Sequence, residues 1–530
     1  MRTFARWSGE PIHVSTVLTS DMHAWARGLA QRIGRRVPPL AATRRRRLLL
    51  VHLDGVPKQL LDEAVHTRRM PFFSRLVRSG AYRLEEAFWG SPASTPCFQA
   101  GLLYGIEHPN LPAYSWFDRE MGRQVRMNTP QDASDIEQRL GRTRCPRLFA
   151  EGGHTYFSLF RGGAGNRVCM STLSSLGVLG RALSSEMEGL LAASTVSPGR
   201  YLRLLGRDSW HALCEAWCWG RALRDFRHEG GFLLSRVLLQ RLGWSFAHTK
   251  ALVDMVRGVP ILYLVFGNYD EVAHRRGPRS ELALAELERV DGYLAELYAM
   301  ARTVERPYDL IFLTDHGHVE SLPFEQRQGW RLEDMLLRGP SATLPESVRR
   351  GLLDGRVPGP AGASGPPEVP MVIESGNFAH VYLTRRRQPL EARELLADHR
   401  DVLARASLHP DIGMVALRRG DSAVALVKGE VYGAGEMERA PLAEEFSRRA
   451  VANYLHELPF MPTAGDLVLF GEAVRPGATV GFAWEFGSHG GLTRTETCST
   501  VCWPGEGPVD LSGLTHCVNL HQRLSEAYLA

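Results

Sequence analysis

The sequence predicts an α/β fold built around buried parallel strands. Three largely apolar runs, 48–53, 261–266 and 311–314, lead to an aspartate at or shortly after their ends. Runs of this kind are typical of strands that are covered on both faces of a parallel sheet. Between them, the segment 280–302 repeats Leu and Ala at helical spacing with acidic residues on the other side, which indicates an amphipathic helix.

Length and composition limit the class of protein. With 530 residues the chain can form more than one domain, or one domain with large insertions. A net charge of +5 is small for this length and predicts no specific nucleic-acid partner. We find no signal peptide and no apolar run of about 18 residues, the length of a spanning helix, and therefore expect a cytoplasmic protein.

The eight cysteines are scattered and form no C-x-x-C motif. We interpret them as mostly buried thiols in a reducing compartment. Two disulfides, Cys214–Cys218 and Cys498–Cys502, are the competing interpretation.

Residues 1–47 are expected to form an N-terminal lead-in. Residues 25–33 could form a short amphipathic helix, and four arginines follow at 44–47. A basic segment beside apolar residues can make peripheral contact with an anionic membrane. The alternative is a solvated approach to the first strand.

The first part of the core is predicted at 48–164. Its first strand ends at Asp54, and Gly55 allows a sharp turn there. A helix is expected within 59–80. A later strand leads into a Pro-flanked turn with the adjacent hydroxyls Ser94 and Thr95, followed by an apolar helix at 98–104. A hydroxyl in this place is either an N-cap or a nucleophile favoured by the helix dipole.

Two insertions are predicted to interrupt the core. The first, 165–258, is mostly helical, with apolar periodicity in 179–191, 201–218 and 232–242. The core resumes at 259–321 and is completed by 481–530. The second insertion, 322–480, mixes a Gly/Pro-rich loop at 355–370 with strands at 371–383 and 413–428 and a helix at 390–406. Both insertions leave from strand ends, so we expect them to frame a pocket at the carboxyl edge of the sheet.

Metal-ligating side chains gather at these strand ends. Asp270 and His274 are four residues apart, so they share one helix face. Each residue alone could be structural, but together they predict two divalent metal ions. Carboxylate and imidazole ligands suit zinc best and also admit manganese or iron. The predicted protein ligands are Asp54, Asp270, His274, Asp315, His316 and His489.

These motifs, in the order in which they occur along the chain, resemble those of the alkaline phosphatase superfamily, and within it those of the type I phosphodiesterase/nucleotide pyrophosphatase branch. The segments that carry the resemblance are 53–55, 94–96, 270–274, 314–317 and 488–490. The resemblance implies a three-layer α/β/α core. It also implies that Asp270, His274 and His489 bind one zinc ion, and that Asp54, Asp315 and His316, with the nucleophile hydroxyl, bind the other.

One departure from the family concerns the nucleophile. Many diesterases of this branch have Thr-aromatic-Pro-Asn, whereas this chain has Thr95-Pro96-Cys97-Phe98. Aligned on the family motif, the spacing to the downstream Gly105 favours Thr95 as the nucleophile. The spacing to the proline favours Ser94. We predict Thr95, with Ser94 as the alternative. The expected Asn is missing, so an oxyanion donor is not identified and the substrate class stays open.

The predicted function is two-metal hydrolysis of phosphate esters, as a phosphodiesterase with a covalent phospho-threonine intermediate. The same site could serve a phosphomonoesterase, a phospho-group transferase, or a phosphonate or sulfate esterase. A membrane-surface or scaffold protein without catalysis is the alternative from another class. The substrate would be a small-molecule, lipid or nucleotide phosphoester. The proposed substrate contacts are Tyr114, Trp116 and Asn377. For Tyr114 and Asn377, structural hydrogen bonding is the competing role. The sequence does not specify the oligomeric state.

Overall fold

The computed structural model describes most of the chain. The predicted helices between 179 and 242 and the loop at 355–370 lie almost entirely outside the described residues. The described ranges are 20–40, 46–172, 243–353 and 370–529, except Arg36, Arg144 and Arg167, together with the single residues Gly206, Trp210, Leu213 and Cys214.

A six-stranded sheet forms the centre of the molecule, in the order β2-β18-β7-β1-β6-β5. β1, β5, β6 and β7 pair in parallel, as predicted for the apolar runs, and β18 is antiparallel to both of its neighbours. The strand bounds are β1 Arg47–Leu53, β2 Tyr82–Ala87, β5 His154–Tyr156, β6 Ile261–Phe266, β7 Tyr308–Leu313 and β18 Ser499–Pro504.

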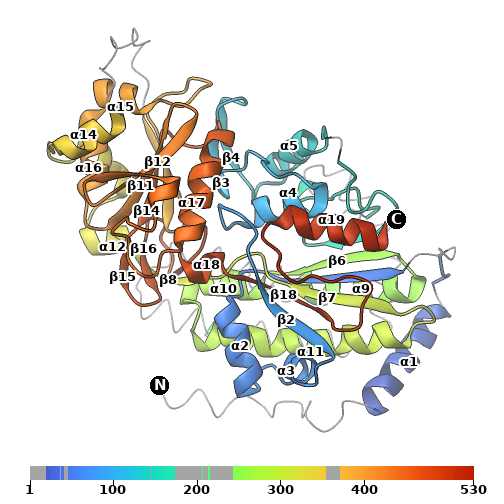
Figure 1. Ribbon diagram of the computed structural model, residues 1–530. Coiled ribbons are helices and arrows are strands. Elements are labelled where there is room, and N and C mark those ends of the chain that lie inside the picture. Colours follow the sequence, from blue (N-terminus) through green and yellow to red (C-terminus); the bar gives the residue numbers. More distant parts are fainter. Residues whose placement is uncertain are drawn as a thin grey trace.

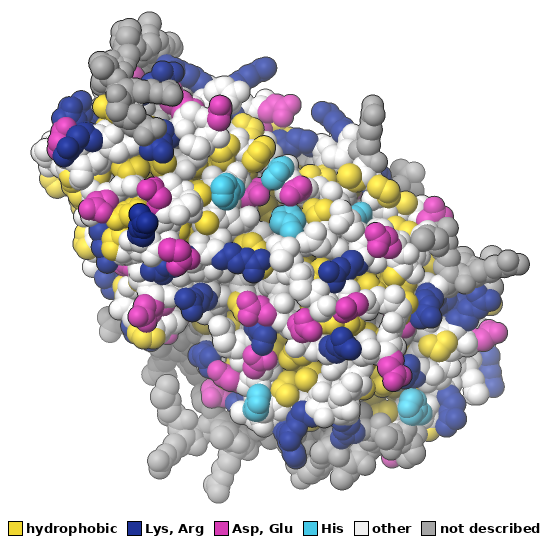
Figure 2. All heavy atoms as spheres, viewed as in Figure 1, with side chains coloured by type: hydrophobic (Ala, Val, Ile, Leu, Met, Phe, Trp, Pro, Cys, Tyr) yellow, Lys and Arg dark blue, Asp and Glu magenta, His cyan; other side chains and the backbone are white. Residues whose placement is uncertain are grey.

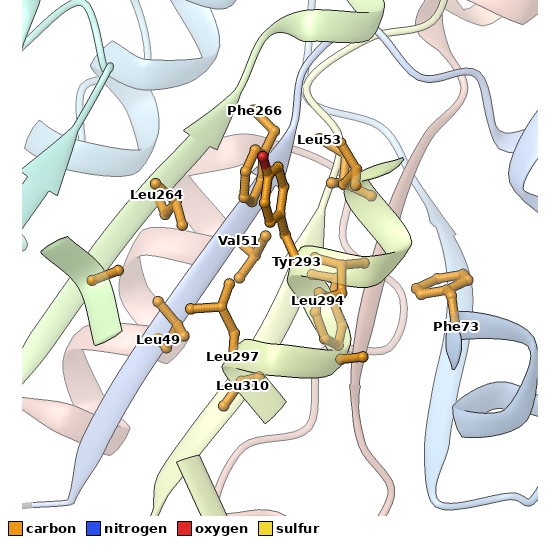
Figure 3. Close-up of a cluster of buried hydrophobic side chains, with 14 of the residues drawn as sticks. Leu49, Val51, Leu53, Phe73, Leu264, Phe266, Tyr293, Leu294, Leu297 and Leu310 are labelled. Atoms are coloured by element: carbon orange, nitrogen blue, oxygen red, sulfur yellow. The ribbon is translucent and has the colours of Figure 1, made fainter. Parts of the chain in front are cut away.

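Helices cover both faces of this sheet, which confirms the three-layer α/β/α fold (Figure 1). Alternate residues of β1 point to opposite layers, because side chains alternate along a strand. Leu49 and Val51 pack under α11 with Leu294 and Leu297 (Figure 3), whereas Leu50 packs on the other face. One layer contains α1 Ser20–Gly34, α2 Lys58–Thr67, α3 Pro71–Arg78, α9 Trp244–Arg257 and α11 Glu281–Thr303; the other contains α4 Thr95–Tyr104, α5 Pro130–Leu140 and α19 Cys517–Tyr528.

The predicted amphipathic helix near the N-terminus is α1, and it is part of this core. Its apolar side chains Ala26, Leu29 and Ile33 are buried, and the helix packs against α9 and α11. Among the described helices, none combines the length and the apolar character needed to cross a membrane. Figure 2 shows acidic and basic side chains interspersed over the face in view, as expected for a small net charge.

The segment after β7 builds a second, antiparallel sheet in the order β13-β12-β11-β14-β10-β9. The strand expected at 371–383 is a hairpin that turns at Gly376, whose φ of +68° suits glycine, and the helix expected at 390–406 is two helices. The elements are β9 Met371–Ser375, β10 Phe378–Tyr382, α15 Ala392–Asp398, α16 Arg400–Leu408, β11 Ile412–Arg419, β12 Ser422–Val427, β13 Glu430–Gly433, α17 Arg448–Glu457 and β14 Leu467–Gly471.

The three helices that precede β9 in sequence contribute to the core on one face of the second sheet. They precede the part of this segment that is not described. Their bounds are α12 Phe324–Gln328, α13 Leu332–Arg338 and α14 Glu346–Leu353.

A small sheet, β15-β16-β8-β17, joins the two larger ones. β8, Val319–Pro323, follows the carboxyl end of β7 after five residues, and β17, Gly487–Ser488, pairs with it directly before His489. The second sheet therefore starts from the edge of the central sheet where the predicted ligands lie (Figure 1). Its other strands are β15 Ala473–Arg475 and β16 Ala478–Gly481.

Candidate active site

Ligand-capable side chains from distant parts of the chain meet beyond the carboxyl ends of β1, β6 and β7. The first group includes Asp270 and His274, which lie on α10, Asn268–Arg276, directly after β6. Asp270 Oδ2 lies 3.5 Å from His274 Nε2, and Asp270 Oδ1 lies 3.8 Å from His489 Nε2. One ligand atom from each of Asp270, His274, His489 and His318 lies within 4.8 Å of the other three, which suits a single metal ion.

The second group surrounds His316. Its Nε2 lies 3.7 Å from Asp54 Oδ1 and 3.3 Å from Asp315 Oδ2. Atoms of Asp54, Asp270 and His316 also lie within 4.8 Å of one another, so the two groups adjoin. The structure therefore brings together all six residues predicted as metal ligands.

The three predicted imidazole ligands are oriented in the same way. The Nδ1 atom of His274 faces Glu485, that of His316 lies 3.3 Å from the Gly317 carbonyl, and that of His489 lies 3.3 Å from the Ala93 carbonyl. An Nδ1–H bonded to an oxygen leaves the lone pair on Nε2, which in each case faces the carboxylates. This is the arrangement of metal-bound histidines in proteins.

His318 differs from these three. Its Nε2 lies 2.6 Å from Asp270 Oδ1, a hydrogen-bond distance, and its buried Nδ1 has no hydrogen-bond partner among the described residues. Burial and the neighbouring His274 lower its pKa to about 4, so the ring is neutral at pH 7. A neutral imidazole that donates to Asp270 orients that carboxylate.

The carboxylates are electrostatically crowded. Burial and the neighbours Asp315 and Asp270 raise the pKa of Asp54 well above its usual range. Burial favours the neutral forms of Asp270 and Asp315 as well, but nearby imidazoles hold their pKa values below the usual range. For His274, burial is outweighed by Glu485 and Asp270, and its pKa rises to about 10. Divalent cations would relieve the repulsion at Asp54.

An unpartnered oxygen supports metal binding in the second group. Asp315 Oδ2 is buried and makes no hydrogen bond in the described part of the chain. A buried carboxylate oxygen without a partner is costly unless a cation accompanies it. The oxygen and nitrogen donors fit a hard or borderline divalent ion such as zinc, manganese or iron.

Of the two candidate nucleophiles, only Thr95 has its hydroxyl placed against this group by hydrogen bonds. Its Oγ1 lies 3.4 Å from Asp54 Oδ1 and 3.2 Å from His316 Nε2. Thr95 is the first residue of α4, and Ser94 precedes it with an extended backbone and no capping hydrogen bond.

The three predicted substrate contacts have different surroundings. Tyr114 is half-buried near the ligands, and burial together with Glu271, Asp54 and Asp270 raises its pKa. Trp116 is fully buried, and its Nε1 lies 3.2 Å from an Asp118 carboxylate oxygen. Asn377 is buried and donates to Thr479 Oγ1 at 3.1 Å.

Two residues at the site were missed from sequence. Glu485 contacts His274, and His52, buried on β1, lies 3.1 Å from Asp315 Oδ1. His52 is two residues before Asp54, so strand alternation places both on one side, and this spacing was an available signal. No sequence signal indicated the pairing of Glu485.

A family model for type I phosphodiesterase/nucleotide pyrophosphatase matches residues 48–414, more than half of the chain. The chain belongs to this family. It is therefore a phosphoester hydrolase of the nucleotide pyrophosphatase type, in a metal-dependent class.

Two solved structures match over most of this chain. Phosphonoacetate hydrolase from Sinorhizobium meliloti 1021 is 18% identical, with 91% of this chain and 96% of that chain covered and a TM-score of 0.44. Murine ectonucleotide pyrophosphatase/phosphodiesterase 5 is 14% identical, with 91% and 94% covered and a TM-score of 0.45. Curated proteins gave no significant sequence match.

Proposed function

We propose that this chain hydrolyses phosphodiesters with two divalent metal ions, and that Thr95 is the nucleophile. The observation that carries the proposal is the position of Thr95 Oγ1, within 3.4 Å of both Asp54 and His316. Asp54, Asp315 and His316 would hold one ion, and Asp270, His274 and His489 the other. Bound there, the ions would supply Lewis-acid chemistry that favours the Thr95 alkoxide and offsets negative charge on the phosphoryl oxygens.

The residues around Thr95 position it for attack. The Thr95 hydroxyl lies 3.4 Å from Asp54 Oδ1 and 3.2 Å from His316 Nε2, so its one proton is directed at these two acceptors and leaves in their direction when a phosphodiester is attacked. A bond then forms between Oγ1 and phosphorus, and the bond from phosphorus to the leaving oxygen breaks. Water hydrolyses the phospho-threonine in the second step and regenerates the hydroxyl.

The N-terminus of α4 supports the same step. Thr95 is the first residue of this ten-residue helix. The unpaired N–H groups and the helix dipole favour an anionic phosphoryl group in this position. They would replace part of the contribution expected from the missing Asn. Tyr114 is the one predicted substrate contact that is half-exposed beside the ligands, and we propose that it faces the leaving group.

The compartment and the metal are further parts of the proposal. Cys498 and Cys502 are free thiols, which agrees with a reducing, cytoplasmic setting and not with the alternative disulfide. We favour zinc for the mixed imidazole and carboxylate ligands. The apolar side chains of α1 are buried in the core, so α1 does not offer them to a membrane, and we propose that any peripheral membrane contact uses the basic segment 44–47.

A substrate panel tests the proposal. The enzyme would be assayed with p-nitrophenyl phosphate, bis-p-nitrophenyl phosphate and a nucleotide diester, before and after chelation and again after zinc is restored. We expect diester cleavage that the chelator abolishes and zinc restores. Preference for the monoester would instead indicate a phosphomonoesterase. Stoichiometric metal without turnover of any phosphoester, phosphonate or sulfate ester would favour the non-catalytic alternative.

A further inference from the structure

A buried imidazole lies directly behind Asp315. His52 and Tyr263, on the neighbouring strands β1 and β6, are both completely buried. His52 Nδ1 lies 2.7 Å from the Tyr263 hydroxyl oxygen, and His52 Nε2 lies 3.1 Å from Asp315 Oδ1. A chain of polar groups therefore runs from the core of the sheet to the candidate metal site.

The contacts define where the protons lie. The Tyr263 hydroxyl makes no second hydrogen bond to the described residues, so its proton is donated to His52 Nδ1. An imidazole that accepts on Nδ1 carries its proton on Nε2, the atom that lies 3.1 Å from Asp315 Oδ1 without completing a hydrogen bond of regular geometry. Burial, with Asp315 and Asp54 nearby, raises the pKa of Tyr263, so the hydroxyl remains a donor.

The two oxygens of Asp315 are thereby distinguished. Oδ1 accepts the backbone N–H groups of Gly55 at 3.2 Å and His316 at 2.9 Å, in addition to facing His52. Oδ2 is buried without a hydrogen bond. The protein thus engages one oxygen fully and leaves the other directed at His316 Nε2, 3.3 Å away.

The His52 ring also contacts the helix of the nucleophile. Its centroid lies 5.3 Å from that of Phe98, edge to face, and Phe98 is in the first turn of α4. One imidazole therefore touches both the helix that begins at Thr95 and the carboxylate of Asp315.

We propose that His52 and Tyr263 are positioning residues that hold Asp315 with Oδ2 free for a metal ion. The pair restricts the carboxylate to one orientation, because His52 Nε2 lies against Oδ1 and the Tyr263 hydroxyl fixes the His52 ring. Outer partners of metal ligands typically change metal affinity by 10–100-fold. This inference rests on the proposed two-metal site, and it concerns only the ion of Asp54, Asp315 and His316.

The test measures metal affinity directly. Zinc dissociation constants would be determined by chelator competition for the wild type and for Tyr263→Phe, His52→Leu and His52→Gln. The same variants in a His274→Ala background isolate the ion at Asp315. Two variants are controls. Tyr308→Phe is the matched control for Tyr263→Phe, because the buried Tyr308 hydroxyl donates to the Val259 carbonyl at the opposite end of the same sheet.

His380→Gln controls for loss of a buried imidazole in the second sheet. Unfolding of the zinc-free proteins is recorded in parallel.

We expect Tyr263→Phe and His52→Leu to weaken one zinc ion about tenfold or more and to leave the other unchanged. His52→Gln should recover part of the affinity, because its amide can donate to Oδ1. Unchanged affinities in both Tyr263→Phe and His52→Leu would overturn the inference, even if the zinc-free proteins were less stable. Equal weakening by Tyr308→Phe would also overturn it. A wild type that binds fewer than two ions would contradict the proposed function itself, and this inference with it.

Discussion

The Nδ1 atom of His274 lies 3.0 Å from Glu485 Oε2 and 3.1 Å from the Gly487 carbonyl oxygen. Glu485 is in the segment between β16 and β17. A residue more than 200 positions further along the chain therefore orients His274, which follows β6. The hydrogen bond directs Nε2 toward Asp270, and it increases the basicity of the ring as a ligand.

We therefore predict that Glu485→Gln weakens zinc binding at Asp270, His274 and His489 by about 10–100-fold. The ion at Asp315 should be unaffected, so chelator competition should show one altered and one unaltered ion. Glu472→Gln changes a half-buried carboxylate directly after β14, so it is the control and should leave both affinities as in the wild type. Loss of both ions in Glu485→Gln would contradict this prediction, because it would show that the contact between Glu485 and His274 is needed for both metal ions.

How far the sequence predicts this site depends on what positions each residue. Asp54, Asp315 and His316 follow strands that are buried on both faces, so their place at the carboxyl edge followed from local pattern alone. Glu485 and His52 act through contacts with residues more than 200 positions away. Such contacts depend on the packing of the completed fold.

The same distinction applies to the fold. The buried strands were predicted closely, but one helix expected within 59–80 is two, α2 and α3. Arg68 adopts a left-handed backbone with φ of 58°, and Pro71 starts the second helix. The proline was a visible signal for a new helix start. The domain boundaries at 165, 259, 322 and 481 stay predictions.

A second prediction concerns pH and Asp291. This buried carboxylate on α11 accepts the N–H groups of Phe72 and Phe73 at the start of α3, both at 2.8 Å. Burial raises its pKa to about 6, against the opposing effect of the two N–H donors. The unfolded value is about 3.9. The folded state thus binds the proton more tightly, and the resulting stabilisation is present below pH ~4.

Stability from Asp291 should therefore fall as pH rises from about 4 to about 6, by at most about 3 kcal/mol. Urea midpoints measured across this range should show the fall in the wild type. Asp291→Asn cannot titrate, so the difference between the two proteins should change with pH only inside this window. A constant difference from pH 4 to 7 would contradict the assignment.

A third prediction concerns α1. Leu29 and Ile33 are buried in the core on one face of the central sheet. Leu29→Ala should cost about 2–5 kcal/mol in the free energy of unfolding, because it leaves a cavity. Arg27→Ala, on the exposed side, should change stability by about 0.5 kcal/mol or less. If Leu29→Ala retained full stability but weakened binding to anionic vesicles, the apolar face would serve a membrane and not the core.

A fourth prediction separates the two hydroxyls. Thr95→Ala should fold and keep both metal ions, because the lost groups are small, and it should lose several orders of magnitude in kcat. Thr95→Ser should retain part of the activity, and Ser94→Ala should be mildly affected. Steady-state rates with bis-p-nitrophenyl phosphate measure this pattern, with metal content determined for each variant. An essential Ser94 and a dispensable Thr95 would move the nucleophile by one residue.

The covalent intermediate is the most direct test of the proposed mechanism. Zinc-loaded enzyme would be mixed with a diester substrate in a single turnover, quenched with acid and analysed by peptide mass spectrometry. We predict a phosphoryl adduct on Thr95 that forms and decays at the rate of turnover and is absent from Thr95→Ala. Rapid turnover with no adduct on any peptide, together with full activity of the Ser94→Ala, Thr95→Ala double variant, would contradict the phospho-threonine mechanism.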